Sequence, residues 1–265
     1  MKKLLSVLTI LIISLLTSAA NAGDDGKIQI NGKNNGYVEA KDCFEKVNRG
    51  IFGFNQILDK TIFKPLAKGY RMFPQPIRSG TSNALTNLTN VVTIPNNILQ
   101  GEFRKAGVNS GRFIINTTIG ILGLIDVAQH IGFPEYEKED YGQSLAKMGV
   151  GPGCYVVLPV LGPSTVRDAT ASLVNFVGGD AWYNVTVGND TRYFSDIDYY
   201  SSKLTSGIDF RAKNFDAIDN LEKNSIDFYA SVKSLYLQDR QQKILNVNKI
   251  IETQNDSDWE EIDNQ

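Results

Sequence analysis

The feature that most restricts the fold of this 265-residue chain is a long middle region with few charged side chains. Three stretches, 79–101, 113–125 and 148–166, contain no Asp, Glu, Lys or Arg. A surface that faces water normally carries charged side chains at short intervals. We therefore expect much of this middle region to avoid water.

The three uncharged stretches do not have the composition of membrane-spanning helices. The first is rich in Asn and Thr, and the second is shorter than the roughly 20 apolar residues that a span requires. The third contains several Gly and Pro residues, which would leave backbone groups without hydrogen bonds in lipid. Two interpretations remain open, a soluble domain with a large buried core or a monotopic protein embedded in one leaflet.

The N-terminus is typical of a secretory signal peptide. Lys2 and Lys3 precede an apolar run at 4–16, and Ala20-Asn21-Ala22 provides an A-x-A cleavage site. We predict a signal peptide at 1–22 and expect export without lipid modification, because no cysteine directly follows the apolar run. The other predicted segments are a flexible lead-in (23–41), a helical domain (42–249) and an acidic disordered tail (250–265).

Apolar periodicity in the first part of the domain predicts one amphipathic helix followed by a connector. We expect Pro65 to end the helix, Pro74 and Pro76 to form the connector, and Gly80 to break the chain on its far side. The apolar stripe, at spacings of three and four residues, consists of Phe44, Val47, Ile51, Phe54, Leu58 and Ile62.

The rest of the domain also reads as helical, so the predicted fold class is all-α. The only strand signal, at 155–158, is short and bounded by proline. The predicted helices are 103–118, 121–131, one that starts at Pro163, and a long C-terminal helix with apolar stripes at 208–221 and 226–236 that breaks near Asn224.

The sequence offers little that could support catalysis, a cofactor or a metal. The chain has one histidine, His130, and two cysteines, and no G-x-S-x-G motif supplies a nucleophile. A net charge of −2 gives no electrostatic basis for binding nucleic acid. The charged run 135–140 is interpreted as a solvated loop, and Arg167 with Asp168 as an internal ion pair at a helix start. We therefore predict a protein that is not an enzyme.

Two further features have open interpretations. Gly149-x-Gly151-x-Gly153 lacks the spacing of a dinucleotide or phosphate-binding loop, so these glycines are expected to give backbone freedom. In an exported chain Cys43 and Cys154 meet an oxidising compartment and could pair, the alternative being two separate thiols.

Taken in order, motifs along the chain resemble those of the MlaA/VacJ family of outer-membrane phospholipid-transport proteins. The resemblance runs from about Asp42 to Arg240. Each motif is weak alone, whereas their order and spacing are specific. The matching residues include Asp42, Phe44, Glu45, Asn48 and Arg49 in an opening motif, then Arg112, Asn116 and Asp126, the glycine run Gly149–Gly153 with Tyr155, Arg167-Asp168, and Tyr229, Tyr236 and Arg240 near the C-terminus.

The resemblance implies a ring-like monotopic protein in the periplasm-facing leaflet of the outer membrane, with a central amphipathic channel. Phospholipid misplaced in the outer leaflet would pass through this channel to a periplasmic carrier protein, and members associate with porin trimers. The loop formed by Gly149, Gly151, Gly153 and Tyr155 would lie beside the channel as a hinge. The competing hypotheses are a soluble periplasmic lipid-binding protein and a lipid hydrolase, and the hydrolase lacks a nucleophile–base arrangement.

The chain departs from the family pattern at several positions. Cys43 and Cys154 stand where the family has prolines, which hints at a disulfide, although Phe228 also replaces a family proline. Lys233 replaces a family arginine. The usual lipid anchor is missing, so the expected membrane attachment rests on the embedded apolar surface.

Overall fold

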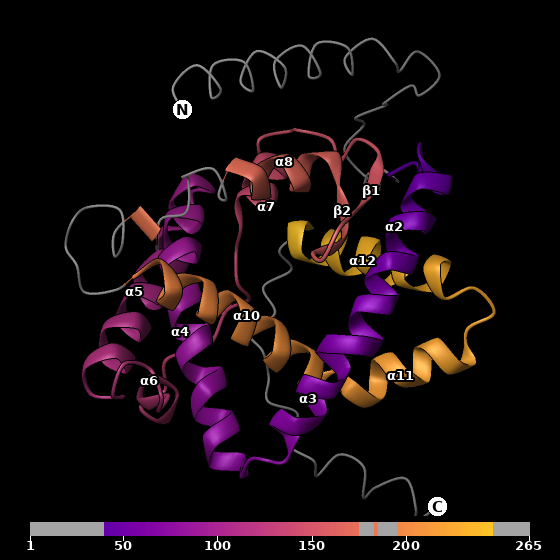
Figure 1. Cartoon of the computed structure of the whole chain (residues 1–265). Coiled ribbons are helices and arrows are strands. Elements are labelled where there is room, and N and C mark those ends of the chain that lie inside the picture. Colours follow the sequence, from indigo (N-terminus) through magenta and orange to yellow (C-terminus); the bar gives the residue numbers. More distant parts are fainter. Residues whose placement is uncertain (1–39, 175–182, 185–194, 246–265) are drawn as a thin grey trace, which may run out of the picture. The chain divides into compact units, whose positions relative to one another are not determined.

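The structure is a computed structural model that describes residues 40–174, 183–184 and 195–245. The predicted signal peptide (1–22) and acidic tail (250–265), and all but the last two residues of the lead-in, lie outside the described residues. The described helices are α2 (Glu45–Leu58), η1 (Asp59–Phe63), α3 (Lys64–Arg71), α4 (Gln75–Leu99), α5 (Phe103–Thr118), α6 (Val127–His130), α7 (Tyr141–Lys147), α8 (Val166–Val174), α10 (Asp196–Lys213), α11 (Phe215–Asn224) and α12 (Phe228–Leu245) (Figure 1).

The first predicted helix exists, but Pro65 does not end it. The chain passes from α2 through the π-helical turn η1 into α3, and Pro65 lies in the first turn of α3. In η1 the Lys64 N–H donates to the carbonyl of Asp59, five residues earlier. This wider turn separates the proline ring from the preceding carbonyls, so the helical run continues to Arg71.

Two other expected boundaries are also wrong. Gly80 does not break the chain, because α4 runs without interruption from Gln75 to Leu99 and even includes Pro95. The expected helix at 121–131 is reduced to the short α6, because Ile121 and Leu122 adopt positive φ angles of 53° and 56°. These residues form a tight turn after α5, and α5 itself has the predicted bounds.

The predominantly helical fold class is confirmed, with one antiparallel hairpin that periodicity did not predict. Strand β1 (Tyr155–Leu158) pairs with β2 (Gly162–Thr165), and Tyr155 lies opposite Thr165. The helix expected from Pro163 therefore begins only at Val166. Because the hairpin has two short strands, it depends on partners outside the sheet for its stability.

Those partners include two asparagines of α2. The Asn48 amide donates to the Tyr155 carbonyl and accepts from the Val157 N–H, at 3.0 Å each. Two turns later Asn55 donates to the Leu158 carbonyl at 2.9 Å and accepts from the Val160 N–H at 2.8 Å. The two side chains thus provide hydrogen-bond partners for backbone groups along the edge of β1, which Figure 1 shows beside α2.

The C-terminal part consists of three helices rather than the two expected. Ser195 and Asp198 form a capping box at the start of α10. The predicted break near Asn224 is confirmed, since α11 ends there and α12 begins at Phe228. A further break falls at Asn214, which separates α10 from α11.

The distribution of side chains is unusual for a globular protein. Among the described residues, the buried hydrophobic side chains form one small cluster around Tyr155, Val157 and Tyr229, and the others are scattered alanines together with Tyr136 and Tyr199. Many large apolar side chains are exposed, among them Phe103 and Leu122. Within the described ranges, no helix combines the length and hydrophobicity needed to cross a membrane.

Candidate functional site

Helices α4 and α5 lie side by side (Figure 1), and each buries a polar face. The Asn109 amide donates to Asn97 Oδ1 at 2.8 Å, and Ser144 Oγ of α7 donates to Asn96 Oδ1 at 2.6 Å. This run of buried amides follows from the Asn- and Thr-rich composition of α4. The buried polar residues of the two helices are Ser82, Asn87, Asn90, Thr93, Asn96, Asn97, Lys105, Asn109, Arg112 and Asn116.

The same helices and the turn that follows them expose their apolar side chains. Large apolar side chains are exposed at both ends of α4, on α5 and in the turn, while amides are buried, so the usual polarity of a water-soluble helical hairpin is reversed. An exposed apolar patch of this kind indicates a surface that contacts lipid or protein. The exposed large apolar residues here are Ile77, Ile98, Leu99, Phe103, Ile114, Ile119, Ile121, Leu122, Leu124, Ile125 and Ile131.

Polar side chains of α4, α5 and the segments around α6 line a cavity of about 230 Å³. Its charged wall is organised by Arg112, whose Nη2 donates to Asp126 Oδ2 at 2.6 Å and whose Nη1 donates to the Phe133 carbonyl at 3.0 Å. Asn116 Nδ2 donates to the other oxygen of Asp126. The lining residues are Ser82, Asn83, Thr86, Asn87, Asn90, Arg112, Asn116, Asp126, Gln129, Glu135, Lys138 and Lys213.

Lys138 has a different environment from the other cations in this wall. It comes from the segment between α6 and α7, and its Nζ donates to the Asn90 side-chain oxygen at 2.8 Å. Burial lowers the pKa of Lys138 to about 8, because the charged form is poorly solvated there. The interpretation of 135–140 as a solvated loop is therefore wrong, since Tyr136 and Glu139 are also buried.

Lys138 also lines a second cavity of about 260 Å³, which has an apolar wall. Leu85, Leu88 and Val92 of α4 form that wall, at spacings of three and four residues that place them on one side of the helix. A polar cavity and a partly apolar cavity thus share one lysine. This arrangement can hold the head and the tail of one amphiphilic molecule.

The three glycines of the predicted hinge lie in the segment between α7 and β1, Tyr155 is the first residue of β1, and none of the four lines either cavity. Gly149 and Gly153 have positive φ angles of 91° and 68°, which favour glycine. A Cβ at Gly151 would meet nothing within 4 Å. Tyr155, grouped with the glycines from sequence, is completely buried beside Tyr229 in the hydrophobic cluster.

The opening motif links α2 to α12, and its Asn48 also holds the hairpin. Asn48 Nδ2 donates to Asp42 Oδ1 at 2.8 Å, and the Tyr229 hydroxyl donates to the other oxygen of Asp42. Arg49 bridges Glu45 and Asp227 at the surface, whereas Phe44 is exposed. These residues therefore connect α2 with α12.

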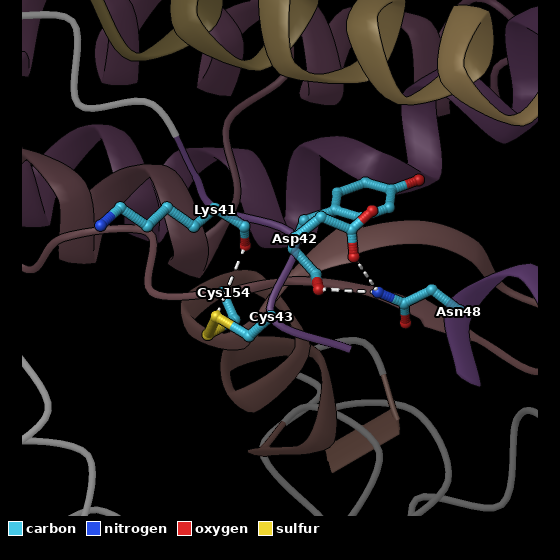
Figure 2. Close-up of a disulfide and its surroundings, with 6 residues drawn as sticks. Lys41, Asp42, Cys43, Asn48 and Cys154 are labelled. Atoms are coloured by element: carbon cyan, nitrogen blue, oxygen red, sulfur yellow. Dashed lines mark hydrogen bonds between the residues drawn. A yellow bond between two sulfur atoms is a disulfide. The ribbon is translucent and has the colours of Figure 1, made fainter. Parts of the chain in front are cut away.

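A disulfide joins Cys43 to Cys154, with the two Cα atoms 5.6 Å apart. Figure 2 shows it next to Lys41, Asp42 and Asn48. The Tyr155 N–H also donates to the Lys41 carbonyl at 2.8 Å. The bridge therefore anchors one end of the glycine segment to the start of the domain.

The expected ion pair between Arg167 and Asp168 is present, at 2.9 Å, and both residues are buried. The pairing of this site with Arg240 was not predicted from the sequence; Arg240 contacts Asp168 at 2.9 Å and Asp140 at 2.6 Å. Burial raises the pKa of Asp168, but the hydrogen bonds from Arg240 and Arg167 outweigh burial and bring this pKa to about 2. This cluster joins α7, α8 and α12.

Comparison with known proteins gives one consistent result. Residues 40–243 match the family model described as MlaA lipoprotein. The chain is 35% identical to a protein of Rickettsia bellii over 91% of this chain and 93% of the relative. It is 34% identical to the Escherichia coli protein named intermembrane phospholipid transport system lipoprotein MlaA, over 74% of this chain and 76% of that protein. The Haemophilus influenzae protein of the same name is 30% identical over 94% and 93%.

Among solved structures, one chain matches with a TM-score of 0.65 and 31% identity. The match covers 78% of this chain and all of the other. The work that reported it is named "Structural basis for maintenance of bacterial outer membrane lipid asymmetry". The similarity thus extends from sequence to the three-dimensional arrangement of the helices.

These names overturn one expectation drawn from the sequence. Attachment without lipid modification was expected, whereas the family and its named relatives are lipoproteins. That expectation rested on the absence of a cysteine directly after the N-terminal apolar run. An apolar surface and a covalent lipid are independent means of attachment, so the exposed side chains are compatible with either. With the matched region spanning nearly all of the described residues, the chain belongs to the MlaA lipoprotein family.

Proposed function

We propose that this protein transports phospholipid between membranes and maintains the lipid asymmetry of the outer membrane. In this role it removes misplaced phospholipid from the outer leaflet and passes it toward the periplasm. The observation that carries the proposal is the reversed polarity of α4 and α5, which bury amides and expose apolar side chains. The names of the relatives support the same role.

The reversed polarity suits a molecule that sits in a leaflet and gives a lipid headgroup a polar route. Apolar side chains on the outside are stable against acyl chains, while a buried polar path replaces the water that a headgroup loses. We propose that the two cavities belong to an amphipathic channel within a ring of helices. Passage through such a channel needs no chemical turnover.

The relatives are named as parts of a transport system, so this protein requires partners. The finer assignment proposed here is a periplasmic lipid-carrier protein that receives the phospholipid and a porin trimer that holds the channel. The exposed apolar side chains provide the surface for such a porin. The segment with Gly149, Gly151 and Gly153 is proposed as the hinge that moves as a headgroup passes.

Deletion of the gene tests the proposal. Phospholipid in the outer leaflet should rise, measured by the accessibility of headgroups to an external phospholipase or a membrane-impermeant label. Complementation with the wild-type gene should restore the original level. Unchanged outer-leaflet phospholipid in a deletion strain with an intact outer membrane would contradict the proposed function.

A further inference from the structure

We propose that Lys138 binds the phosphodiester of a phospholipid headgroup, at the point where the polar cavity adjoins the apolar one. This inference rests on the proposed transport function and gives it a specific contact. The chemistry recognised is an anionic phosphate group attached to an apolar chain.

The hydrogen-bond partners of the cations in the polar cavity distinguish Lys138. Arg112 is held by Asp126 at 2.6 Å, and Lys213 by Asp209 at 3.0 Å. Within the described part of the chain, Lys138 bonds instead to a neutral group, the Asn90 amide oxygen. An ammonium has three donors, so two N–H groups of Lys138 remain for a ligand.

The environment of Lys138 favours an anion. A half-buried cation that faces an amide is less stable than one that faces an opposite charge, so a bound anion would offset its loss of hydration. Two acidic groups, Asp126 and Glu135, face Arg112. Arg112 Nη2 lies 2.6 Å from Asp126 Oδ2 and 3.8 Å from Glu135 Oε2. Arg112 balances one of these two negative charges, and the charge of Glu135 raises the pKa of Lys138 without outweighing the effect of burial.

The neighbouring cavity identifies the rest of the ligand. Leu85, Leu88 and Val92 of α4 line this cavity together with the lysine and with Ser202 and Ser206 of α10. Two carboxylates, Glu139 and Asp140, also line it; Asp140 is paired with Arg240, and Glu139 accepts a hydrogen bond from Gln100. A free phosphate ion would gain nothing from the apolar wall, whereas an acyl chain would bury apolar surface there. A lysine shared by both cavities thus matches a phosphate that carries a hydrocarbon chain.

The test uses the full-length protein purified in detergent and a fluorescent phosphatidylglycerol as probe. Lys138→Gln removes the charge and should weaken lipid binding about tenfold or more, the usual effect of losing a charge-assisted hydrogen bond. Lys138→Arg should retain most of the affinity. The matched control is Lys223→Gln, which removes an exposed lysine of α11 that lines neither cavity.

A second variant keeps the lysine and changes its partner. Asn90→Asp places a carboxylate against Nζ in place of the amide. The carboxylate balances the positive charge of the ammonium, so lipid binding should also fall. Thermal unfolding and circular dichroism establish that each variant is folded. If Lys138→Gln does not fold, Asn90→Asp still decides the question.

Inorganic phosphate separates the two sources of the anion. It should compete poorly with the fluorescent lipid, and equal competition at matched concentration would overturn the lipid assignment in favour of free phosphate. Equal lipid binding by wild type and both variants would overturn the role of Lys138 while leaving the transport function intact. A wild-type protein that binds no phospholipid at all would instead refute the proposed function.

Discussion

At the scale of single residues, amides and charged groups hold the helices and the hairpin together, a role that apolar side chains have in most domains. Asn48 and Asn55 replace a neighbouring strand for β1 through four hydrogen bonds. Arg240 connects Asp140 and Asp168 from different helices. Each such contact leaves a buried polar group unpaired when one partner is removed, which makes these positions sensitive to substitution.

Gly142 and Gly50 provide a matched pair of helical glycines. A Cβ at Gly142 would overlap Arg240 Nη2 and Asp168 Oδ1, whereas one at exposed Gly50 would meet nothing within 4 Å. We predict that Gly142→Ala lowers the free energy of unfolding by about 1–3 kcal/mol. Gly50→Ala should raise it by about 0.5–1 kcal/mol, because alanine favours helix. Denaturant unfolding measures both, and equal effects of the two changes would contradict the contact at Gly142.

The low pKa of Asp168 predicts how stability depends on pH. The carboxyl titrates near 3.8 when unfolded and at about 2 in the structure, so its contribution is fully present above pH 4 and is lost as the pH falls toward 2. This contribution is on the order of 2 kcal/mol. Asp168→Asn should lower stability at pH 7 and flatten the fall between pH 4 and pH 2 in thermal unfolding. An unchanged slope would show that Asp168 is not responsible.

The sequence predicted the Arg167–Asp168 pair because the two residues are neighbours. It did not predict the contact of Asp168 with Arg240, which is 72 residues away, or the burial of Lys138. A charged run normally faces water, and only the uncharged stretches on both sides of 135–140 indicated otherwise. Ion pairs between residues far apart in the sequence can be identified only from the folded structure, because no local sequence pattern specifies the partner.

At the scale of elements, apolar periodicity predicted the bounds of α5 and the break at Asn224. It failed where the backbone departs from ideal geometry. Proline at the start of α3 is tolerated because η1 widens the helix before it, and the residues after Gly120 turn through left-handed conformations instead of forming a helix. Such local changes of backbone geometry leave the spacing of the apolar residues unchanged. Apolar periodicity therefore does not reveal them.

The disulfide is expected to stabilise the junction between the start of the domain and the hairpin. It closes a loop over a sequence separation of 111 residues, which corresponds to up to about 4–5 kcal/mol in the loop-entropy model. Reduction should lower the unfolding midpoint of the wild type. The Cys43→Ala/Cys154→Ala double variant should unfold at the lower midpoint and show no response to reductant. If the unfolding midpoint of the wild type does not change with reductant, and two thiols are titratable after denaturation without reductant, the bridge is not formed.

The hinge proposal makes a prediction at Gly151. Its φ lies outside the left-handed region and a Cβ would have free space, so Gly151→Val should leave the protein level and thermal stability unchanged. If the segment moves during transport, the same variant should raise outer-leaflet phospholipid. Gly149→Val is the strained comparison, because its φ of 91° disfavours any side chain. A folded triple Gly→Val variant with normal transport would refute the hinge.

At the scale of the whole molecule, part of the reversed polarity can be predicted from the sequence. The uncharged middle region predicted that water would be avoided, and exposed apolar side chains on α4, α5 and the following turn agree with this. Composition could not say which side of each helix would face outward. That choice depends on the pairing of α4 with α5, which brings the asparagines together.

The exposed apolar surface predicts the amount of detergent that the purified protein binds. Phe103→Lys and Ile114→Lys place charges on the outer side of α5, where the native side chains are 69% and 60% exposed. Bound detergent, measured by light scattering with refractive-index detection, should decrease while the fold is retained. Gln242→Lys on α12 is the control, since it adds the same charge at an exposed polar position. Equal detergent binding by all three variants would show that this surface is not the one covered.

The disulfide between the first described residues and the hairpin sets an order of events as the chain enters an oxidising compartment. A chain emerges N-terminus first, so Cys43 and Asn48 exist well before Cys154 and Val157. In that interval α2 has no hairpin to hold, and the first thiol has no native partner. With only two cysteines in the chain, early oxidation can only join Cys43 to another molecule. The yield of correctly bridged protein is therefore set by the rate of oxidation relative to the rate at which the chain emerges.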